Sequence, residues 1–228
     1  MTDLVFDLPD GATAAVTVTR LLNAGYAGRE QEEVAAHVAE LAELGIPAPA
    51  VTPALYPVAP YLAAQVDGVP VQHGRTSGEA EWALVVAGPA PEDLLLTVAC
   101  DHTDRELEVH GVAWSKNAGL DVLGRGAWRL ADVEEHVDEL RLRAWVTADG
   151  AEHLIQDASL AALLPPRYWL DEIADLLVPG TVLLSGTFAM LPGVDQFAQH
   201  WRVELADPVT SRTLDLGYRV ERMPEPIG

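Results

Sequence analysis

The sequence predicts a β-rich α+β fold, and three features of the chain lead to this prediction. Short segments alternate apolar with polar residues or are apolar throughout, as is typical of strands buried on one or both faces. Turn residues separate these segments, and helical periodicity is confined to one stretch near the N-terminus and one just before residue 179. The 228 residues, 49% of them hydrophobic, are enough for a substantial core.

The first 60 residues are expected to contain strands, one helix and a connector. Residues 4–26 alternate around a Pro-Asp-Gly turn, which predicts a hairpin that leads into a strand. In residues 31–44, QEEVAAHVAELAEL, valines and leucines recur every three or four positions, and the Gly-x-Pro that follows ends the predicted helix. Residues 46–60 contain five prolines and are expected to be an extended connector.

Residues 61–228 are expected to form the larger body, and the chain as a whole is effectively one domain. EAEWALVVAG at residues 79–88 and DLLLTVACDHT at 93–103 predict buried strands. Residues 140–155 alternate and turn at Asp-Gly, which indicates a hairpin. Residues 158–177 are expected to form helices on either side of a Pro-Pro pair. Three further strands are expected within residues 179–191, 201–208 and 213–221.

The charge and the single cysteine exclude several classes of protein. With 14 basic and 35 acidic residues the net charge is −21, which disfavours binding to nucleic acid or to an anionic membrane. Cys100 is the one cysteine, so an intrachain disulfide framework and an all-cysteine zinc site are excluded. The N-terminus has no basic region followed by an apolar run, and no apolar stretch reaches the ~18 residues of a membrane span. We therefore expect a cytoplasmic protein whose partner is a small molecule.

Three carboxylates are candidate metal ligands. Glu79 and Glu81 lie two apart in a predicted strand, so both side chains project from the same face. Asp101 lies at the end of an apolar strand, where an isolated carboxylate would be costly to bury. Oxygen ligands of this kind suit Mg²⁺, Mn²⁺ or Ca²⁺ rather than zinc. The alternatives are a solvated acidic face for the two glutamates and a turn cap for Asp101.

Other residues could carry catalysis. His37 and Glu40 are three apart on the predicted helix, where they could form a hydrogen-bonded pair that orients a general base, or an ordinary surface ion pair. Lys116 is the one lysine among 14 basic residues, either by chance or because a compact ammonium is needed. Gly186 and Thr187 end an apolar strand, where they could bind a carbonyl or anionic oxygen or simply form a turn.

In their order along the chain these motifs resemble the fumarylacetoacetate hydrolase superfamily. HVAELAELGIPAP is similar to the lid helix and the link that follows it, and CDHTDRELE matches the family's acidic stretch at Asp101, Arg105 and Leu107. WSKNAGLDVLGRGAW resembles the lysine-containing segment, and PGTVLLSGTFAM the strand and turn near the C-terminus. The chain departs from the pattern at Cys100, in place of an asparagine, and at Phe188, in place of a proline.

The resemblance implies a β-sandwich roll with an N-terminal lid helix, a homodimer and a set of residue roles. Mg²⁺, with Mn²⁺ or Ca²⁺ possible, would polarise a substrate carbonyl. Lys116 would neutralise a developing enolate, and His37, held by Glu40, would move a proton. The implied metal ligands are Glu79, Glu81 and Asp101, and the implied substrate-binding residues are Arg105, Gly186 and Thr187.

The activity implied in this way is a metal-dependent hydrolase that cleaves a C–C bond of a 2-oxo or 1,3-diketo acid such as an acylpyruvate. A lyase acting on a 2-oxo acid, namely a decarboxylase, hydratase or isomerase, needs the same metal and the same enolate stabilisation. A non-catalytic protein that binds a small molecule is the second alternative. The products of the reaction separate the first two, and absence of Mg²⁺ binding would favour the third.

Overall fold

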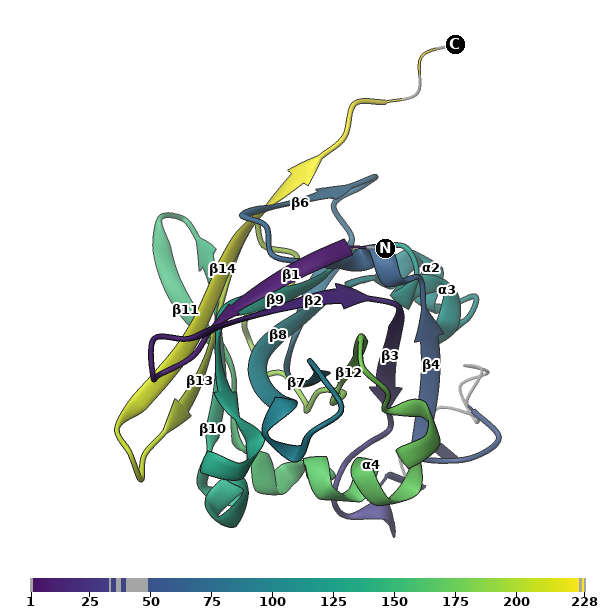
Figure 1. Ribbon diagram of the computed structural model, residues 1–228. Helices are drawn as coiled ribbons and strands as arrows, with labels where there is room; N and C mark the ends of the chain where they lie inside the picture. Colours follow the sequence, from purple (N-terminus) through teal and green to yellow (C-terminus); the bar gives the residue numbers. More distant parts are fainter. Residues whose placement is uncertain (1, 33, 36–37, 40–48, 226, 228) are drawn as a thin grey trace.

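The computed structural model describes residues 2–32, 34–35, 38–39, 49–225 and 227, and these residues form two β-sheets with a few short helices (Figure 1). The order across the nine-stranded sheet is β2 (Thr13–Val18), β1 (Thr2–Asp7), β9 (Asp121–Arg129), β8 (Leu94–Asp104), β7 (Thr76–Val86), β12 (Thr181–Leu184), β3 (Arg20–Gly25) and β4 (Ala54–Val58), with β5 (Ala63–Ala64) paired to β9. The order across the five-stranded sheet is β11 (Ala151–Ser159), β10 (Arg141–Ala148), β13 (His200–Asp207), β14 (Arg212–Arg222) and β6 (Gly68–Val71).

The helices are short. Three short α-helices lie within residues 49–225, namely α2 (Arg105–Glu108), α3 (Val112–Lys116) and α4 (Pro166–Glu172). The 3₁₀ turns are η1 (Pro60–Leu62), η2 (Pro91–Asp93), η3 (Leu130–Asp132), η4 (Glu134–Glu139), η5 (Leu160–Ala162) and η6 (Ala174–Leu176). Both sheets are mixed, since β1 with β9, β12 with β3, and β14 with β6 pair in parallel whereas the long neighbours pair antiparallel. The predicted β-rich α+β class with mixed sheets is confirmed.

The two hairpins predicted from turn residues are present. β1 and β2 pair antiparallel from Thr2 opposite Val18 to Asp7 opposite Thr13. β10 and β11 are joined at Asp149 and Gly150, whose φ angles of 52° and 78° are the left-handed values that a tight hairpin turn needs. Local turn chemistry therefore determined both connections.

The predictions for residues 158–177 and for the connector were wrong in part. Residues 158–159 still belong to β11, the helical structure before the two prolines is only the 3₁₀ turn η5, and Pro166 lies in the first turn of α4. This position suits proline, because the first N–H groups of a helix have no partner within it. The proline-rich connector contains β4, which pairs antiparallel with β3 at the edge of the large sheet, where a proline is tolerated.

Two apolar clusters fill the molecule. One consists of residues from β1, β2, β3, β4, β7, β8, β9 and β12, so the large sheet curls around it (Figure 1). The other lies between the large sheet and the small one and contains the buried side chains of Trp82, Trp128 and Trp201. Strands β7 and β8 therefore have one face toward each cluster.

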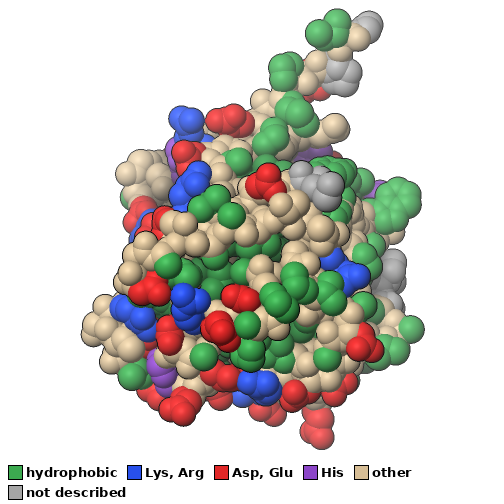
Figure 2. Space-filling view, viewed as in Figure 1, with side chains coloured by type: hydrophobic (Ala, Val, Ile, Leu, Met, Phe, Trp, Pro, Cys, Tyr) green, Lys and Arg blue, Asp and Glu red, His purple; other side chains and the backbone are tan. Residues whose placement is uncertain are grey.

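The surface carries both negative and positive side chains, in a chain whose acidic residues are in excess. Figure 2 shows acidic side chains spread over one face and interspersed with arginines and apolar groups. Within the described part of the chain, no helix has both the length and the apolar character needed to cross a membrane.

Candidate active site

The antiparallel pairing of β7 and β8 brings the three predicted metal ligands together. Glu79 lies directly opposite Asp101 in the register, and Glu81 projects from the same face of β7 two residues further on. One carboxylate oxygen from each of the three residues lies within 4.8 Å of the others. Glu81 and Asp101 are buried, with 0% and 1% of their surface exposed, so the solvated-face interpretation does not hold for Glu81.

Lys116, the last residue of α3, places its ammonium among these carboxylates. Its Nζ lies 2.5 Å from Asp101 Oδ2, 3.0 Å from Asn23 Oδ1 and 3.5 Å from Glu79 Oε2. Burial alone would lower the pKa of Lys116, but the surrounding carboxylates, Asp101 first, raise it well above its usual value. The side chain is therefore a buried, permanently charged ammonium.

Arg105 holds the outermost carboxylate. Asp104 caps α2 by accepting hydrogen bonds from the N–H groups of the next turn, and Arg105 is the first residue of that helix. Its guanidinium donates to Glu79 Oε1 at 2.8 Å, to Glu108 Oε2 at 3.0 Å and to Ser77 Oγ at 2.7 Å. Burial would raise the pKa of Glu79, but Arg105 and Lys116 outweigh it and lower that pKa to about 2. Glu79 is therefore ionised at any working pH.

Two buried polar residues complete the cluster, and the sequence analysis missed both. Asn23 of β3 donates from Nδ2 to Asp101 Oδ2 at 3.1 Å and to Asp121 Oδ1 at 3.3 Å. Asp121 begins β9 and is fully buried; burial, reinforced by the charge of Asp101, raises its pKa well above the usual range. A signal was present in RLLNAG and GLDVLG, because a polar residue inside an apolar strand needs a buried partner.

Gly186 and Thr187 lie beside the cluster and bind the protein itself. The N–H of Gly186 donates to Glu81 Oε2 at 2.7 Å; the residue has φ +76°, and a Cβ would lie 2.9 Å from the carbonyl oxygen of Ala24. Thr187 Oγ1 donates to the Ala80 carbonyl at 2.8 Å and accepts from Gln156 Nε2 at 2.8 Å. Their sequence-predicted contact with substrate stays a prediction, and their observed contacts position Glu81 and β7.

The carboxylates fit a divalent cation. Glu81 Oε1 and Asp101 Oδ1 are buried and have no hydrogen-bond partner among the described residues. Unpaired carboxylate oxygens in such a place are costly, and a hard cation that takes oxygen ligands at about 2.0–2.6 Å would satisfy them. Burial raises the pKa of Glu81 well above its usual value, opposed by Lys116 and reinforced by the charges of Asp101 and Glu79. Without a cation, the cluster therefore favours a proton on Glu81.

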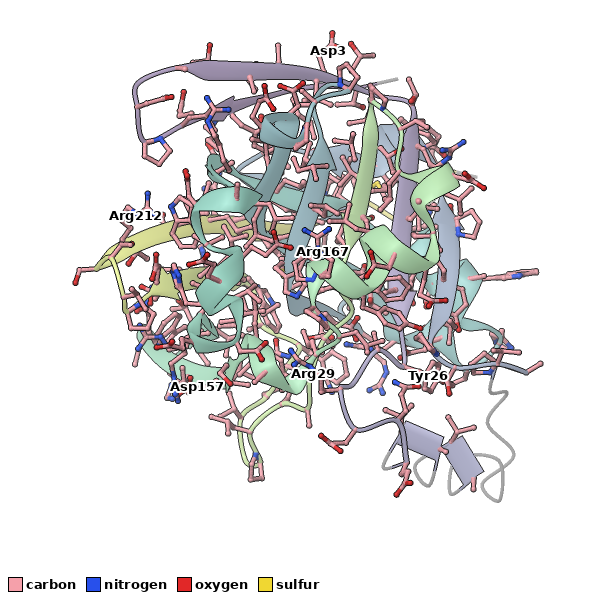
Figure 3. All side chains as sticks on the ribbon, turned by 60° about the horizontal axis from the view of Figure 1, so that its bottom comes forward. Asp3, Tyr26, Arg29, Asp157, Arg167 and Arg212 are labelled. Carbon is pink, nitrogen blue, oxygen red and sulfur yellow. The ribbon has the colours of Figure 1, made fainter. Side chains whose placement is uncertain are left out.

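An open cavity of about 690 Å³ lies next to the cluster and reaches it at Glu79. Figure 3 shows Tyr26, one of its lining residues, at the end of the molecule where the N-terminal helical residues are drawn. The lining residues are Tyr26, Val34, Glu79, Arg105, Glu108, Thr187, Phe188, Ala189, Met190 and Gln196. Of the predicted lid pair, His37 and Glu40 lie outside the described residues, although helical residues 34–35 and 38–39 flank His37 on both sides.

Several solved structures share this fold at low sequence identity. A 2-keto-3-deoxyarabinonate dehydratase superposes with a TM-score of 0.63 at 17% identity, over 92% of this chain and 75% of that one. A 2-hydroxyhepta-2,4-diene-1,7-dioate isomerase from Mycobacterium marinum gives 0.62 at 16%, over 99% and 100%. The protein Cg1458 gives 0.63 at 18%, over 92% and 78%. The resemblance to the fumarylacetoacetate hydrolase superfamily is thereby confirmed at the level of the fold.

One of these relatives was solved with a metal. A 2-keto-3-deoxy-D-arabinonate dehydratase, complexed with magnesium and 2,5-dioxopentanoate, has a TM-score of 0.61 at 17% identity, over 90% of this chain and 74% of that one. No curated protein matches the sequence of this chain. The chain belongs to the family described as "Protein of unknown function (DUF2848)", which matches residues 24–218.

Proposed function

We propose that this member of the family is a divalent-metal-dependent enzyme that forms an enolate of a 2-oxo acid, in a lyase-type reaction such as dehydration or isomerisation. One observation carries the proposal. Three carboxylates, two of them with unpaired buried oxygens, surround a buried ammonium at the edge of an open cavity. The dehydratase and isomerase with this fold, one of them solved with magnesium, support the reaction type.

A cation held by Glu79, Glu81 and Asp101, Mg²⁺ in the first place, would supply Lewis-acid polarisation of the substrate carbonyl. The ammonium of Lys116 has three N–H donors, of which Asp101 and Asn23 take two at hydrogen-bond distance. The third can be given to a substrate oxygen that gains negative charge as the enolate forms. Arg105 and Gly186 keep Glu79 and Glu81 in place through the hydrogen bonds described above.

Proton movement at carbon requires a base, and we assign this role to His37 oriented by Glu40, on a lid formed by the N-terminal helix. The assignment rests on their spacing of three residues in a segment that the sequence predicts to be helical. The same pair would serve the second candidate, a C–C bond hydrolase acting on an acylpyruvate-like acid, by activating water. Products distinguish the two, because hydrolysis yields two acids whereas dehydration or isomerisation keeps the carbon chain intact.

Oxalate, a mimic of the enolate, provides the test. In calorimetric titrations oxalate should bind the protein with saturating Mg²⁺ and fail to bind after chelation. Glu79→Gln should abolish this binding, whereas Glu106→Gln, the same loss of charge at an exposed acid, should retain it. Oxalate binding that ignores Mg²⁺, or that survives in Glu79→Gln, would contradict the proposal and favour a metal-free binding protein.

We also propose that the chain forms a homodimer, as expected from the resemblance. Val109, which follows α2, and Trp114 of α3 are 61% and 68% exposed and offer apolar surface to a second copy. Light scattering at moderate salt should give about twice the chain mass of 24.5 kDa. A mass of one chain at all concentrations would refute the proposal.

A further inference from the structure

The charges that line the cavity limit which acids it accepts. Three charged residues line it, Glu79, Arg105 and Glu108, and they sum to −1. The guanidinium of Arg105 is balanced in charge by carboxylates, because Nη1 donates to Glu108 and Nη2 to Glu79, while Nε donates to Ser77. Among the described lining residues Arg105 is the one lysine or arginine, so no free cation faces the cavity from this part of the chain.

The segment that contains the predicted lid pair adds no lysine or arginine to the sequence around this site. Residues 30–48, which include the predicted lid pair, contain five glutamates, Glu40 among them, and no lysine or arginine. Lys116 is buried with 5% exposure and is engaged by Asp101 and Asn23 at the inner end of the site. A second carboxylate in the outer part of the cavity would therefore find negative charge and no cation.

Apolar side chains form one part of the cavity wall, beside the polar Thr187 and Gln196. Phe188 and Met190 are half-buried against the core between the sheets and line the cavity together with Ala189 and Val34. Phe188 places an aromatic ring in this wall. Tyr26 lines the cavity from a left-handed backbone with φ 56°, a conformation that is unfavourable for a residue with a Cβ. Such strain, held by the surrounding fold, is typical of residues that a binding site needs in a fixed place.

We infer that the substrate is a monocarboxylic 2-oxo acid whose tail is uncharged and apolar, alkyl or aryl. Dicarboxylic acids, whose second carboxylate would need a cation in the cavity, are excluded. The acid end lies at the carboxylate cluster, and the tail lies against Tyr26, Phe188 and Met190. A volume of about 690 Å³ is within the range of about 300–1,000 Å³ of pockets that take drug-sized molecules, so the tail extends beyond a methyl group. This inference rests on the proposed function, because it takes the acid end of the substrate to be bound at that cluster.

The test compares two probes of equal length. 2-Oxohexanoate ends in a methyl group and 2-oxoadipate in a carboxylate, and both carry the same 2-oxo acid end. With saturating Mg²⁺ at moderate salt, calorimetry should give a Kd at least about tenfold lower for 2-oxohexanoate, since the second carboxylate of 2-oxoadipate must leave water for an apolar wall that offers it no unbalanced cation. Equal or tighter binding of 2-oxoadipate overturns the inference.

A variant of the apolar wall provides an independent readout. Met190→Arg places a guanidinium in the wall, so the ratio of the two Kd values should fall by about tenfold or reverse, whereas Met190→Leu should keep the wild-type ratio. An unchanged ratio in Met190→Arg overturns the assignment of the tail to this wall. Should the arginine variant fail to fold, the wild-type ratio alone still decides the substrate class.

Oxalate has the acid end and no tail, so its binding tests the proposed function separately from the inference about the substrate tail. Mg²⁺-dependent oxalate binding together with a preference for 2-oxoadipate would leave the proposed function standing and overturn this inference alone. Absence of Mg²⁺-dependent oxalate binding would overturn both.

Discussion

The two faces of the β7–β8 hairpin are both buried, yet their polar chemistry differs. On the face inside the curled sheet, Asp101 lies with Glu79 and Glu81 in a charged cluster with unpaired oxygens. On the opposite face the neighbouring residues Cys100 and His102 form a neutral chain with Tyr218 of β14. One residue along β8 therefore separates a charged site from an uncharged network, because successive side chains of a strand point to opposite faces.

The networks also differ in how completely their atoms are paired. His102 Nδ1 lies 2.9 Å from Tyr218 Oη, and its Nε2 lies 2.9 Å from Thr76 Oγ1, so both ring nitrogens have a partner. Burial raises the pKa of the Cys100 thiol and of the Tyr218 hydroxyl, which keeps both neutral. A satisfied neutral network stabilises the fold, whereas a charged cluster with unpaired oxygens needs a ligand. This comparison predicts that changes on the charged face alter binding and catalysis, and that changes on the neutral face alter stability alone.

The largest effect is expected on the charged face at Lys116. If its ammonium stabilises the enolate, Lys116→Met should lower kcat by about 10²-fold or more, since one lost electrostatic donor costs about 3–4 kcal/mol in the transition state. Mg²⁺ affinity should persist or rise, because the carboxylates lose a neighbouring cation. The measurement is steady-state kinetics on a 2-oxo acid that the wild type turns over, with Mg²⁺ titrations alongside.

Lys116→Arg separates charge from shape. The planar guanidinium is larger than an ammonium and does not fit the same buried volume, so this variant should also be poorly active. Full activity in Lys116→Arg would show that positive charge alone matters, and full activity in Lys116→Met would return the single lysine to chance.

On the neutral face, the largest effect is expected in acid. Burial, with a smaller contribution from Arg105, lowers the pKa of His102 from its usual 6.5 to about 4. The unfolded chain therefore takes up a proton on this residue below pH 6.5 while the folded chain does not, so stability is full above pH 6.5 and falls until about pH 4. The loss is about 3 kcal/mol, from roughly 2.5 pH units at 1.36 kcal/mol each.

His102→Gln should remove this part of the pH dependence. Urea unfolding of the chelator-treated protein at pH 7, 5.5 and 4.5 measures it, and His153→Gln, at an exposed histidine, is the control. The difference in stability between wild type and His102→Gln should shrink as the pH falls. A constant difference would show that His102 takes up its proton in the folded state as readily as in the unfolded one.

Metal binding should depend only on the charged face of the β7–β8 hairpin. Because Mg²⁺ binds the folded state, at 100 times its Kd it should add about 2.7 kcal/mol to the free energy of unfolding. Glu81→Gln should abolish the corresponding rise in Tm, whereas Cys100→Ala, one strand away and facing the other sheet, should keep it. Loss of the shift in Cys100→Ala would break the separation between the two faces.

The sequence was most informative where a short period or a turn decides the outcome. The two-residue period placed Glu79 and Glu81 on one face, and the end of an apolar run marked Asp101, so the candidate metal ligands could be named before the fold was known. The hairpin turn at Asp149 and Gly150 was equally local. Asn23 could have been found by asking which polar residues interrupt apolar strands.

The features of the site that could not be predicted from the sequence depend on packing between segments far apart in the chain. The cavity wall brings together Tyr26 after β3, Arg105 at α2 and Phe188 after β12, and no local pattern relates these three positions. The N–H of Gly186 donates to Glu81, and the β3 segment at Ala24 leaves no room for a Cβ at this position. These contacts follow from how strands far apart in the sequence are aligned, and residue type alone does not reveal that alignment.

The smallest effect is expected for Tyr218→Phe, which removes one hydroxyl from the neutral network. The Oη atom lies 2.9 Å from His102 Nδ1 and 3.2 Å from Cys100 Sγ, so its loss leaves a buried nitrogen without a partner. Such a loss costs about 1–3 kcal/mol, and we expect the lower half of that range because the ring and its packing remain. Urea unfolding should show this destabilisation, while the Mg²⁺-dependent rise in Tm keeps its wild-type size. A change in Mg²⁺ affinity of more than about threefold would mean that the two faces are coupled through β8, because a network that only stabilises the fold has no means of distinguishing the metal-bound from the metal-free protein.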